Sequence, residues 1–216
     1  MAACRTKQAL TEKLVVMLMA ALIIAVAPAQ AHHMPKPEGT QLGHSVPAIG
    51  HGEMLVVARY RSAILDLAQH QMRTDPTMRR LMGYVSLQHF ACWWGLVPGS
   101  LTDEASPFNE CSHADMAGTR ALLTHLSTMP GAQSQARALE ERIASEIAAD
   151  PAFAALCSNS DETFDSGVII GPEWRMAPSH IPTILTGLSL LVLAAACVSL
   201  LARCLRSENP SAASAA

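Results

Sequence analysis

Residues 75–95 read DPTMRRLMGYVSLQHFACWWG, and this stretch predicts one helix with clear ends. Asp75 is a preferred helix-capping residue, and Pro76 suits the first helical position, where its missing amide proton is not needed. Gly95 then breaks the helix. Between these ends, one predicted face carries mostly apolar side chains at helical spacing: Met78, Leu81, Met82, Val85, His89 and Cys92. The stretch therefore predicts a helix over residues 75–94 with one buried face.

Similar signals predict three further helices, over residues 53–73, 112–129 and 133–149. Pro130-Gly131 separates the last two, and Asp150-Pro151 begins a short final turn. Short connections place neighbouring helices antiparallel. Aromatic residues make up only 4% of the chain, which favours closely packed helices over a β-sandwich. The predicted fold class is all-α: a small up-down bundle of about four helices over residues 53–157.

Residues 1–31 have the three parts of a secretory signal peptide in the usual order. A basic segment at residues 5–13 precedes an uninterrupted apolar run at residues 14–26, and Ala29-Gln30-Ala31 forms a cleavage site. The apolar run is shorter than the roughly 20 residues that span a bilayer. We expect cleavage after Ala31, with an uncleaved signal anchor as the alternative.

The C-terminal end predicts a membrane anchor. No charged residue occurs from Ala177 to Ala202, and residues 181–202 are long enough for a transmembrane helix. Arg203 and Arg206 follow at once, and positive residues beside a span mark its cytoplasmic side. The predicted topology is single-pass in the cell inner membrane, with a periplasmic N-terminal domain and a cytoplasmic tail at residues 203–216.

Two segments link the bundle to its surroundings. Residues 32–52 are rich in proline and glycine and predict an extended arm, and residues 158–180 predict a polar stalk. Within the stalk, residues 168–170 could form a short strand or an extended packing segment. From residue 32 to 180 there are 10 Lys/Arg against 16 Asp/Glu, a net charge near −6. This acidity argues against binding nucleic acid or an anionic lipid surface.

Three cysteines fall in the predicted exported domain: Cys92, Cys111 and Cys157. An odd number implies one disulfide and one further thiol. Cys111 and Cys157 both lie in polar surroundings, whereas Cys92 lies on an apolar helix face. We therefore predict a Cys111–Cys157 bridge, with Cys92–Cys111 as the alternative. No C-x-x-C spacing supports thiol redox catalysis.

Four of the nine histidines lie in the arm: His32, His33, His44 and His51. Cleavage after Ala31 would give His32 a free amino group beside its imidazole, a pair that chelates divalent transition metals, copper above all. The spacing matches no zinc finger, and a merely polar linker is the alternative. A second candidate is a site inside the bundle for copper or for the axial ligands of a haem, with gap-filling core methionines as the alternative. Its donors would be His70, Met72, His89, Cys92, His113, Met116 and His125.

Trp93-Trp94, which precedes the break at Gly95, predicts a docking surface, since tryptophan is often energetically dominant at interfaces. The alternative is that one of the two rings belongs to the core and the other is half-exposed. No catalytic motif occurs, so we do not expect an enzyme. Two functional hypotheses follow. The first is a membrane-tethered periplasmic protein that binds or delivers a metal. The second is a scaffold or interaction subunit of a cell-envelope membrane complex, with an envelope protein as its partner and no metal.

Overall fold

The computed structural model describes residues 43–150 and 162–207, with side chains through Leu201. The predicted signal peptide, His32, His33, Cys157 and the turn after Asp150 therefore lie outside the described residues. The described elements, in chain order, are β1 (Ser45–Val46), α2 (His51–Gln69), α3 (Pro76–Cys92), η1 (Trp94–Leu96), α4 (Asn109–Leu126), α5 (Gln133–Ala149), β2 (Phe164–Asp165), η3 (Trp174–Ser179) and α6 (Ile181–Ser207). The chain is mostly helical, and the predicted all-α bundle is confirmed.

The ends of α3 follow from local chemistry. The Asp75 carboxylate accepts a 2.8 Å hydrogen bond from the Met78 amide, and Pro76 takes the first helical position, as the sequence predicts. The helix ends after Cys92 because Trp93 has a left-handed backbone conformation, with φ at 56°. A residue with a left-handed backbone conformation commonly follows the last residue of a helix, and it is usually glycine.

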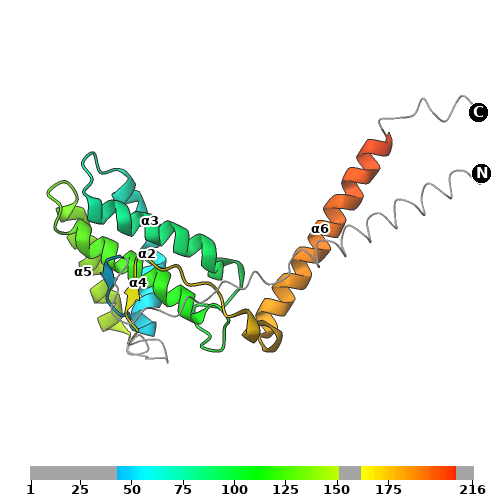
Figure 1. Cartoon of the computed structure of the whole chain (residues 1–216), viewed down its shortest axis with the longest axis horizontal. Coiled ribbons are helices and arrows are strands. Elements are labelled where there is room, and N and C mark those ends of the chain that lie inside the picture. Colours follow the sequence, from blue (N-terminus) through cyan, green and yellow to red (C-terminus); the bar gives the residue numbers. More distant parts are fainter. Residues whose placement is uncertain (1–42, 151–161, 208–216) are drawn as a thin grey trace, which may run out of the picture. The chain divides into compact units, whose positions relative to one another are not determined.

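Helix α4 lies at the centre of the bundle and packs against α2, α3 and α5 (Figure 1). Most of its circumference is buried, including Met116, Leu122 and Leu123. Gly118 allows α3 to approach closely, since a Cβ atom there would come within 2.7 Å of the Tyr84 ring. The size of residue 118 thus limits how closely α3 and α4 can pack.

Side-chain contacts show which helices run antiparallel. At one end of the α3–α4 pair, the Asp75 carboxylate lies 2.8 Å from His125 Nε2, and at the other end Cys92 is bonded to Cys111. Helix α5 likewise runs back along α2, where Arg59 meets Glu146. The bundle has the antiparallel arrangement that the sequence predicts, although α3 and α4 are joined by the long connection at residues 93–108 and α2 and α5 are not consecutive.

The arm and the stalk are more ordered than the sequence indicates. Strands β1 and β2 pair antiparallel, with Val46 opposite Phe164, and both side chains are buried in the core. Gly43 is needed at the edge of this pair, since a Cβ atom there would come within 2.4 Å of the Gly167 amide nitrogen. The arm therefore ends in the domain core, and α2 begins at His51 rather than Glu53.

Helix α6 contains 21 residues, Ile181–Leu201, that are long and apolar enough to cross a membrane. At 1.5 Å per residue this stretch measures about 31 Å, close to the thickness of a bilayer core. No residue of the stretch is buried. Its first six residues belong to the compact unit Glu38–Thr186, and the helix from Gly187 onward belongs to a second unit. An apolar helix of this length is compatible with a membrane anchor.

Candidate functional site: the C-terminal end of helix α3

The disulfide joins Cys92 to Cys111, with 5.5 Å between their Cα atoms. The predicted Cys111–Cys157 bridge is therefore wrong, and the alternative weighed against it is correct. Helix α4 begins at Asn109, three residues earlier than predicted, so Cys111 lies in its first turn and faces the last turn of α3. Both cysteines are buried together with Phe108 and Val97 in a small apolar cluster of their own.

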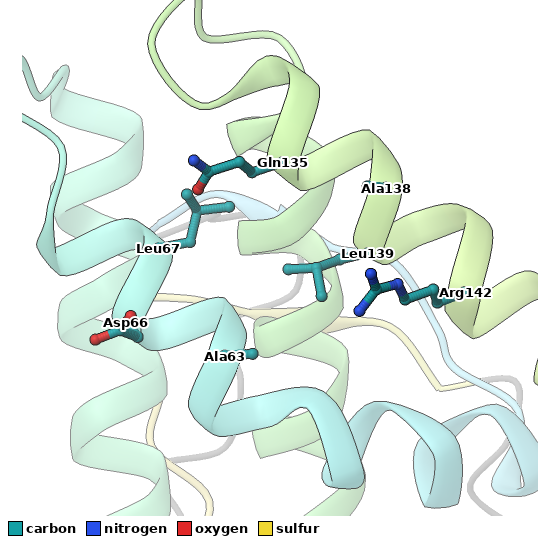
Figure 2. Close-up of a pocket in the computed structure, with 7 residues that line it drawn as sticks. All are labelled: Ala63, Asp66, Leu67, Gln135, Ala138, Leu139 and Arg142. Atoms are coloured by element: carbon teal, nitrogen blue, oxygen red, sulfur yellow. The ribbon is translucent and has the colours of Figure 1, made fainter.

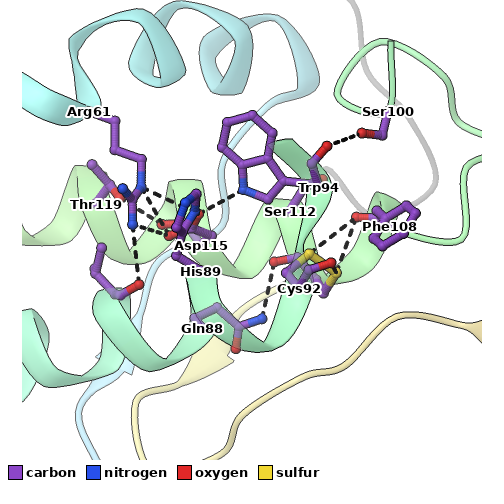
Figure 3. Close-up of polar contacts among 12 residues, drawn as sticks. Arg61, Gln88, His89, Cys92, Trp94, Ser100, Phe108, Ser112, Asp115 and Thr119 are labelled. Atoms are coloured by element: carbon purple, nitrogen blue, oxygen red, sulfur yellow. Dashed lines mark hydrogen bonds and ion pairs between the residues drawn. A yellow bond between two sulfur atoms is a disulfide. The ribbon is translucent and has the colours of Figure 1, made fainter. Parts of the chain in front are cut away.

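Asp115 of α4 is a fully buried carboxylate beside this cluster, and three side chains converge on it (Figure 3). Trp94 Nε1 donates a 2.8 Å hydrogen bond to Oδ2, and His89 Nδ1 lies 2.9 Å from the same oxygen. The Arg61 guanidinium lies 3.4 Å from the carboxylate and supplies a compensating positive charge. A buried charge needs such partners, because its transfer out of water is costly.

The Asp115 carboxylate orients the His89 imidazole, whose side chain is 42% exposed. Carboxylate-oriented imidazoles act as general bases or metal ligands when a nucleophile or further donors stand beside them. Within residues 43–150 and 162–201, no three His, Cys, Asp or Glu side chains are grouped so that they could hold a metal. The arrangement fixes the loop after α3 by joining His89 and Trp94 to α4.

The two predicted interaction residues point in different directions. Trp94 turns inward to Asp115, and its backbone oxygen accepts a hydrogen bond from the Ser100 hydroxyl (Figure 3). Trp93 is 50% exposed and is the only non-glycine residue with positive φ in the described parts of the chain. A left-handed conformation costs a non-glycine residue about 1–2 kcal/mol. The backbone conformation that directs Trp93 outward therefore lowers the stability of the fold.

Trp93 belongs to an exposed apolar surface, which we call the α3 surface. It comprises five large side chains near the C-terminal end of α3, with exposed fractions of 50–75%: Leu87, Phe90, Trp93, Leu96 and Trp174. Leu87, Phe90 and Trp93 follow one another at three-residue steps, and Trp93 meets Trp174 edge-on at 6.5 Å between ring centroids. No Asp, Glu, Lys or Arg occurs from Leu81 to Thr102. Depletion of charge together with enrichment in aromatic residues is typical of interface cores.

The predicted stalk completes this surface. The Gln88 amide donates to the Ile170 carbonyl at 2.6 Å and accepts from the Ile170 amide at 3.0 Å. The Glu173 amide donates to the Pro107 carbonyl at 2.8 Å, and the Trp174 ring packs edge-on against Phe108. Residues 168–170 thus form the extended packing segment rather than the strand, and they hold Trp174 beside Trp93.

Of the predicted metal ligands of the arm, His44 and His51 lie within the described residues, and their surroundings differ. His44 is exposed, and its backbone bonds to Ser166 across the β1–β2 pair. His51 is buried in the first turn of α2, and its ring lies 5.6 Å from that of His113 of α4. Burial lowers the pKa of His113, so its ring is neutral at pH 7. The structure thus brings one arm histidine to one bundle histidine.

A cleft of about 300 Å³ lies between α2 and α5. Leu67, Leu139 and two alanines give it apolar walls, while Asp66 points away from α5 and Arg142 lies at the other end (Figure 2). Ligand sites combine apolar walls with a few polar groups that converge on one point. The polar side chains of this cleft do not converge, so we assign it no function.

Comparison with family models, with curated proteins and with solved structures gave no match. Sequence reasoning missed Asp115 and Trp174. Asp115 lies four residues after Cys111 and seven before Leu122, so helical periodicity alone would have put a carboxylate on the buried face of α4. Trp174 has no such signal, because its role depends on a contact with a residue 81 positions earlier in the chain.

Proposed function

We propose that the chain is a membrane-tethered interaction subunit of a cell-envelope complex, which binds an envelope protein through the α3 surface. Trp93 carries this proposal. A half-exposed tryptophan in a left-handed conformation costs stability, and strained residues of this kind concentrate at functional sites. Its neighbours Phe90 and Trp174 extend the same apolar surface. Burial of three aromatic side chains against a partner would supply a strong binding core.

The proposal also includes the membrane topology of the chain. Residues 1–31 are a cleaved signal peptide, residues 32–180 lie in the periplasm, and α6 anchors them in the inner membrane with its C-terminal end in the cytoplasm. The apolar stretch Ile181–Leu201 supports the anchor, and Arg203 and Arg206 support its direction.

A protein suits the α3 surface better than a lipid surface does. Segments that bind membrane surfaces usually carry lysine or arginine, which attract anionic headgroups. The α3 surface has neither between Leu81 and Thr102, and Arg175, which follows Trp174, is paired with Glu173. Residues 32–180 carry a net charge near −6, with 10 Lys/Arg against 16 Asp/Glu. The surface is also held in shape by the Asp115 contacts and the disulfide, and such preorganisation lowers the entropic cost of binding a rigid partner.

The experiment compares a double variant, Leu87→Ser with Phe90→Ser, with the control Met72→Ser. Met72 is fully exposed in the loop between α2 and α3, away from the C-terminal end of α3, so its substitution matches the loss of an exposed apolar side chain. Membranes containing the full-length chain are solubilised in mild detergent and separated by native electrophoresis. We expect the chain in a larger complex, which the double variant loses and the control retains. The same mobility for all three chains would contradict the proposal.

A second candidate function is metal binding or delivery, with copper as the first metal to test. The contact between His51 and His113 favours it, because an arm ligand already lies beside a neutral imidazole of the bundle. His32 with its amino group, His33 and His44 would supply further donors from the arm.

Metal titration of the purified full-length chain tests this candidate. Truncation of the arm is unsuitable, because Val46 and Ile49 belong to the core. Two substituted chains are therefore compared with wild type, one with alanine at His32 and His33 and one with His51→Gln. Copper, nickel, cobalt and zinc are titrated calorimetrically. Metal binding is expected to weaken at least tenfold in both variants. Equal or absent binding in all three chains would eliminate this function.

A further inference from the structure

We infer that the partner buries an uncharged hydrogen-bond donor, a hydroxyl or an amide N–H group, against Nε2 of His89. This inference rests on the proposed function and adds the chemistry by which the partner is recognised. It depends on the place of His89 beside the α3 surface, on the ring proton that the Asp115 carboxylate fixes, and on the charge already present around that carboxylate.

His89 lies at the edge of the α3 surface. It precedes Phe90 in the chain and Trp93 by one helical turn, and the Trp93 amide donates to its carbonyl oxygen at 3.3 Å. Its imidazole meets the Trp94 ring edge-on, at 5.5 Å between ring centroids. With 42% of its side chain exposed, His89 reaches solvent beside the turn that directs Trp93 outward. A partner that packs over Phe90 and Trp93 therefore contacts His89 as well.

The hydrogen bond to Asp115 fixes the position of the ring proton of His89. Nδ1 lies 2.9 Å from Oδ2 of Asp115, and a carboxylate oxygen only accepts, so Nδ1 carries the proton. In the neutral ring, Nε2 then has a lone pair and no proton. Among the residues that the structure describes, none donates a hydrogen bond to Nε2. A buried carboxylate thus holds an available acceptor in one direction, which lowers the entropic cost of using it in an interface.

This acceptor restricts what a partner can place over it. An apolar cover would remove Nε2 from water without giving it a hydrogen bond, and that loss would oppose binding. A partner that packs tightly over the α3 surface must therefore supply a donor at this point. The donor is uncharged, because the Arg61 guanidinium already lies 3.4 Å from the Asp115 carboxylate and balances its charge. A lysine or arginine of the partner would bring a second buried cation with no carboxylate of its own.

Two replacements of His89 in the full-length chain test this inference. His89→Asn keeps a donor at the position of Nδ1 and removes Nε2, whereas Nε2-methylhistidine keeps the bond to Asp115 and blocks Nε2. Detergent-solubilised membranes are separated by size-exclusion chromatography, which gives the ratio of complexed to free chain. We expect both replacements to lower this ratio at least about tenfold, since each leaves a buried donor of the partner unpaired. His70→Asn is the matched control, because His70 Nδ1 is paired with the Asp66 carboxylate at the end of α2, and it should leave the ratio unchanged.

The other outcomes separate this inference from the proposed function. Complex formation by both His89 chains, together with its loss in the Leu87 and Phe90 double variant, would overturn the inference and leave the interaction subunit intact. A complex that survives the double variant would overturn the proposed function as well. A loss in only one of the two His89 chains would reflect the fold or the added bulk, and it would overturn the inference.

Two further measurements test the uncharged donor. The effect of His89→Asn should be the same at low and high salt, because salt does not screen a hydrogen bond between uncharged groups. An effect that shrinks as salt rises would identify a charged donor. Dissociation of the wild-type complex by a metal chelator would identify a metal ion on Nε2. Either result would overturn the inference.

Discussion

Trp93 and Trp94 are adjacent in sequence, but their side chains lie on opposite sides of the same turn. Trp94 faces inward, where its indole nitrogen bonds to the buried Asp115 carboxylate. Trp93 faces outward, half exposed and in a left-handed conformation. The inner side of the turn contains a charge network and a disulfide, whereas the outer side contains exposed apolar side chains, with the Glu173–Arg175 ion pair beside Trp174. The comparison indicates that the contacts on the inner side fix the geometry of the turn, and that this geometry exposes the apolar side chains on the outer side.

The largest effect is expected on the inner side, from Asp115→Ala. The substitution leaves Arg61, His89 and Trp94 without their common acceptor, and breaking a buried ion pair typically costs about 3–5 kcal/mol. Urea unfolding of the detergent-solubilised chain, followed by tryptophan fluorescence, measures the change. Asp66→Ala is the matched control, since Asp66 pairs with His70 at an exposed site. A loss below 1 kcal/mol for Asp115→Ala would mean that the network does not stabilise the turn.

Removal of the disulfide should have the next largest effect. Replacing both Cys92 and Cys111 with alanine frees a loop with a sequence separation of 19, which corresponds to about 3 kcal/mol in the chain-entropy model. The same unfolding measurement applies, and Cys197→Ser serves as the control because Cys197 is a free cysteine. Peptide mapping without reduction should recover Cys92 linked to Cys111. A peptide that links Cys111 to Cys157 instead would refute the observed pairing.

A smaller loss is expected where α3 and α4 approach most closely. Gly118→Ala places a methyl group against the Tyr84 ring and Val85, and such overpacking costs about 1–3 kcal/mol. Gly83→Ala is an informative control, because a Cβ atom at that exposed position of α3 meets nothing within 4 Å. We expect Gly83→Ala to be neutral or stabilising in the unfolding measurement. If both variants lost equal stability, the tight contact would not be the cause.

The smallest effect on stability is expected on the outer side, from Trp93→Gly. Glycine relieves the left-handed conformation but loses the edge contact with Trp174, and these terms, each about 1 kcal/mol, oppose one another. We expect a net change below about 1 kcal/mol, against a loss of at least about 2 kcal/mol for Trp94→Gly, which removes a half-buried ring. Native electrophoresis should nevertheless show that Trp93→Gly loses the large complex. A stable, fully assembled Trp93→Gly variant would show that Trp93 has no part in binding.

The helices could be predicted from sequence because their signals are local. Asp75 and Pro76 define the start of α3, and α5 spans residues 133–149 as predicted. The β1–β2 pair could not be predicted, since each strand has only two residues and the partners are about 120 positions apart. The disulfide depends on which helix ends meet in space, and α4 begins three residues earlier than its sequence pattern indicates.

The candidate site was predicted only in part, for a related reason. Trp93-Trp94 is visible in the sequence as a pair of large aromatic residues before a break. One core ring and one half-exposed ring was the alternative to a docking surface, but which ring would face inward could not be predicted. The directions of the two rings follow from the backbone conformation of Trp93 and from the hydrogen bond to Asp115, which lies 21 residues beyond Trp94. Of the four arm histidines, His44 and His51 lie within the described residues, and of these two His51 lies beside a second histidine, His113.

The two-residue pairing of β1 with β2 has a mechanical consequence. Ser45 lies opposite Asp165, so the end at which the chain enters β1 is also the end at which it leaves β2 toward α6. A pulling force between the N-terminal arm and α6 would first break the contacts of Ile170 with Gln88 and of Glu173 with Pro107, and would then open the β1–β2 pair one hydrogen bond after another. Pairs loaded in this way yield at much lower force than pairs sheared along their length. Under tension the domain would thus release a segment of its own chain first and keep the bundle, with its disulfide, intact.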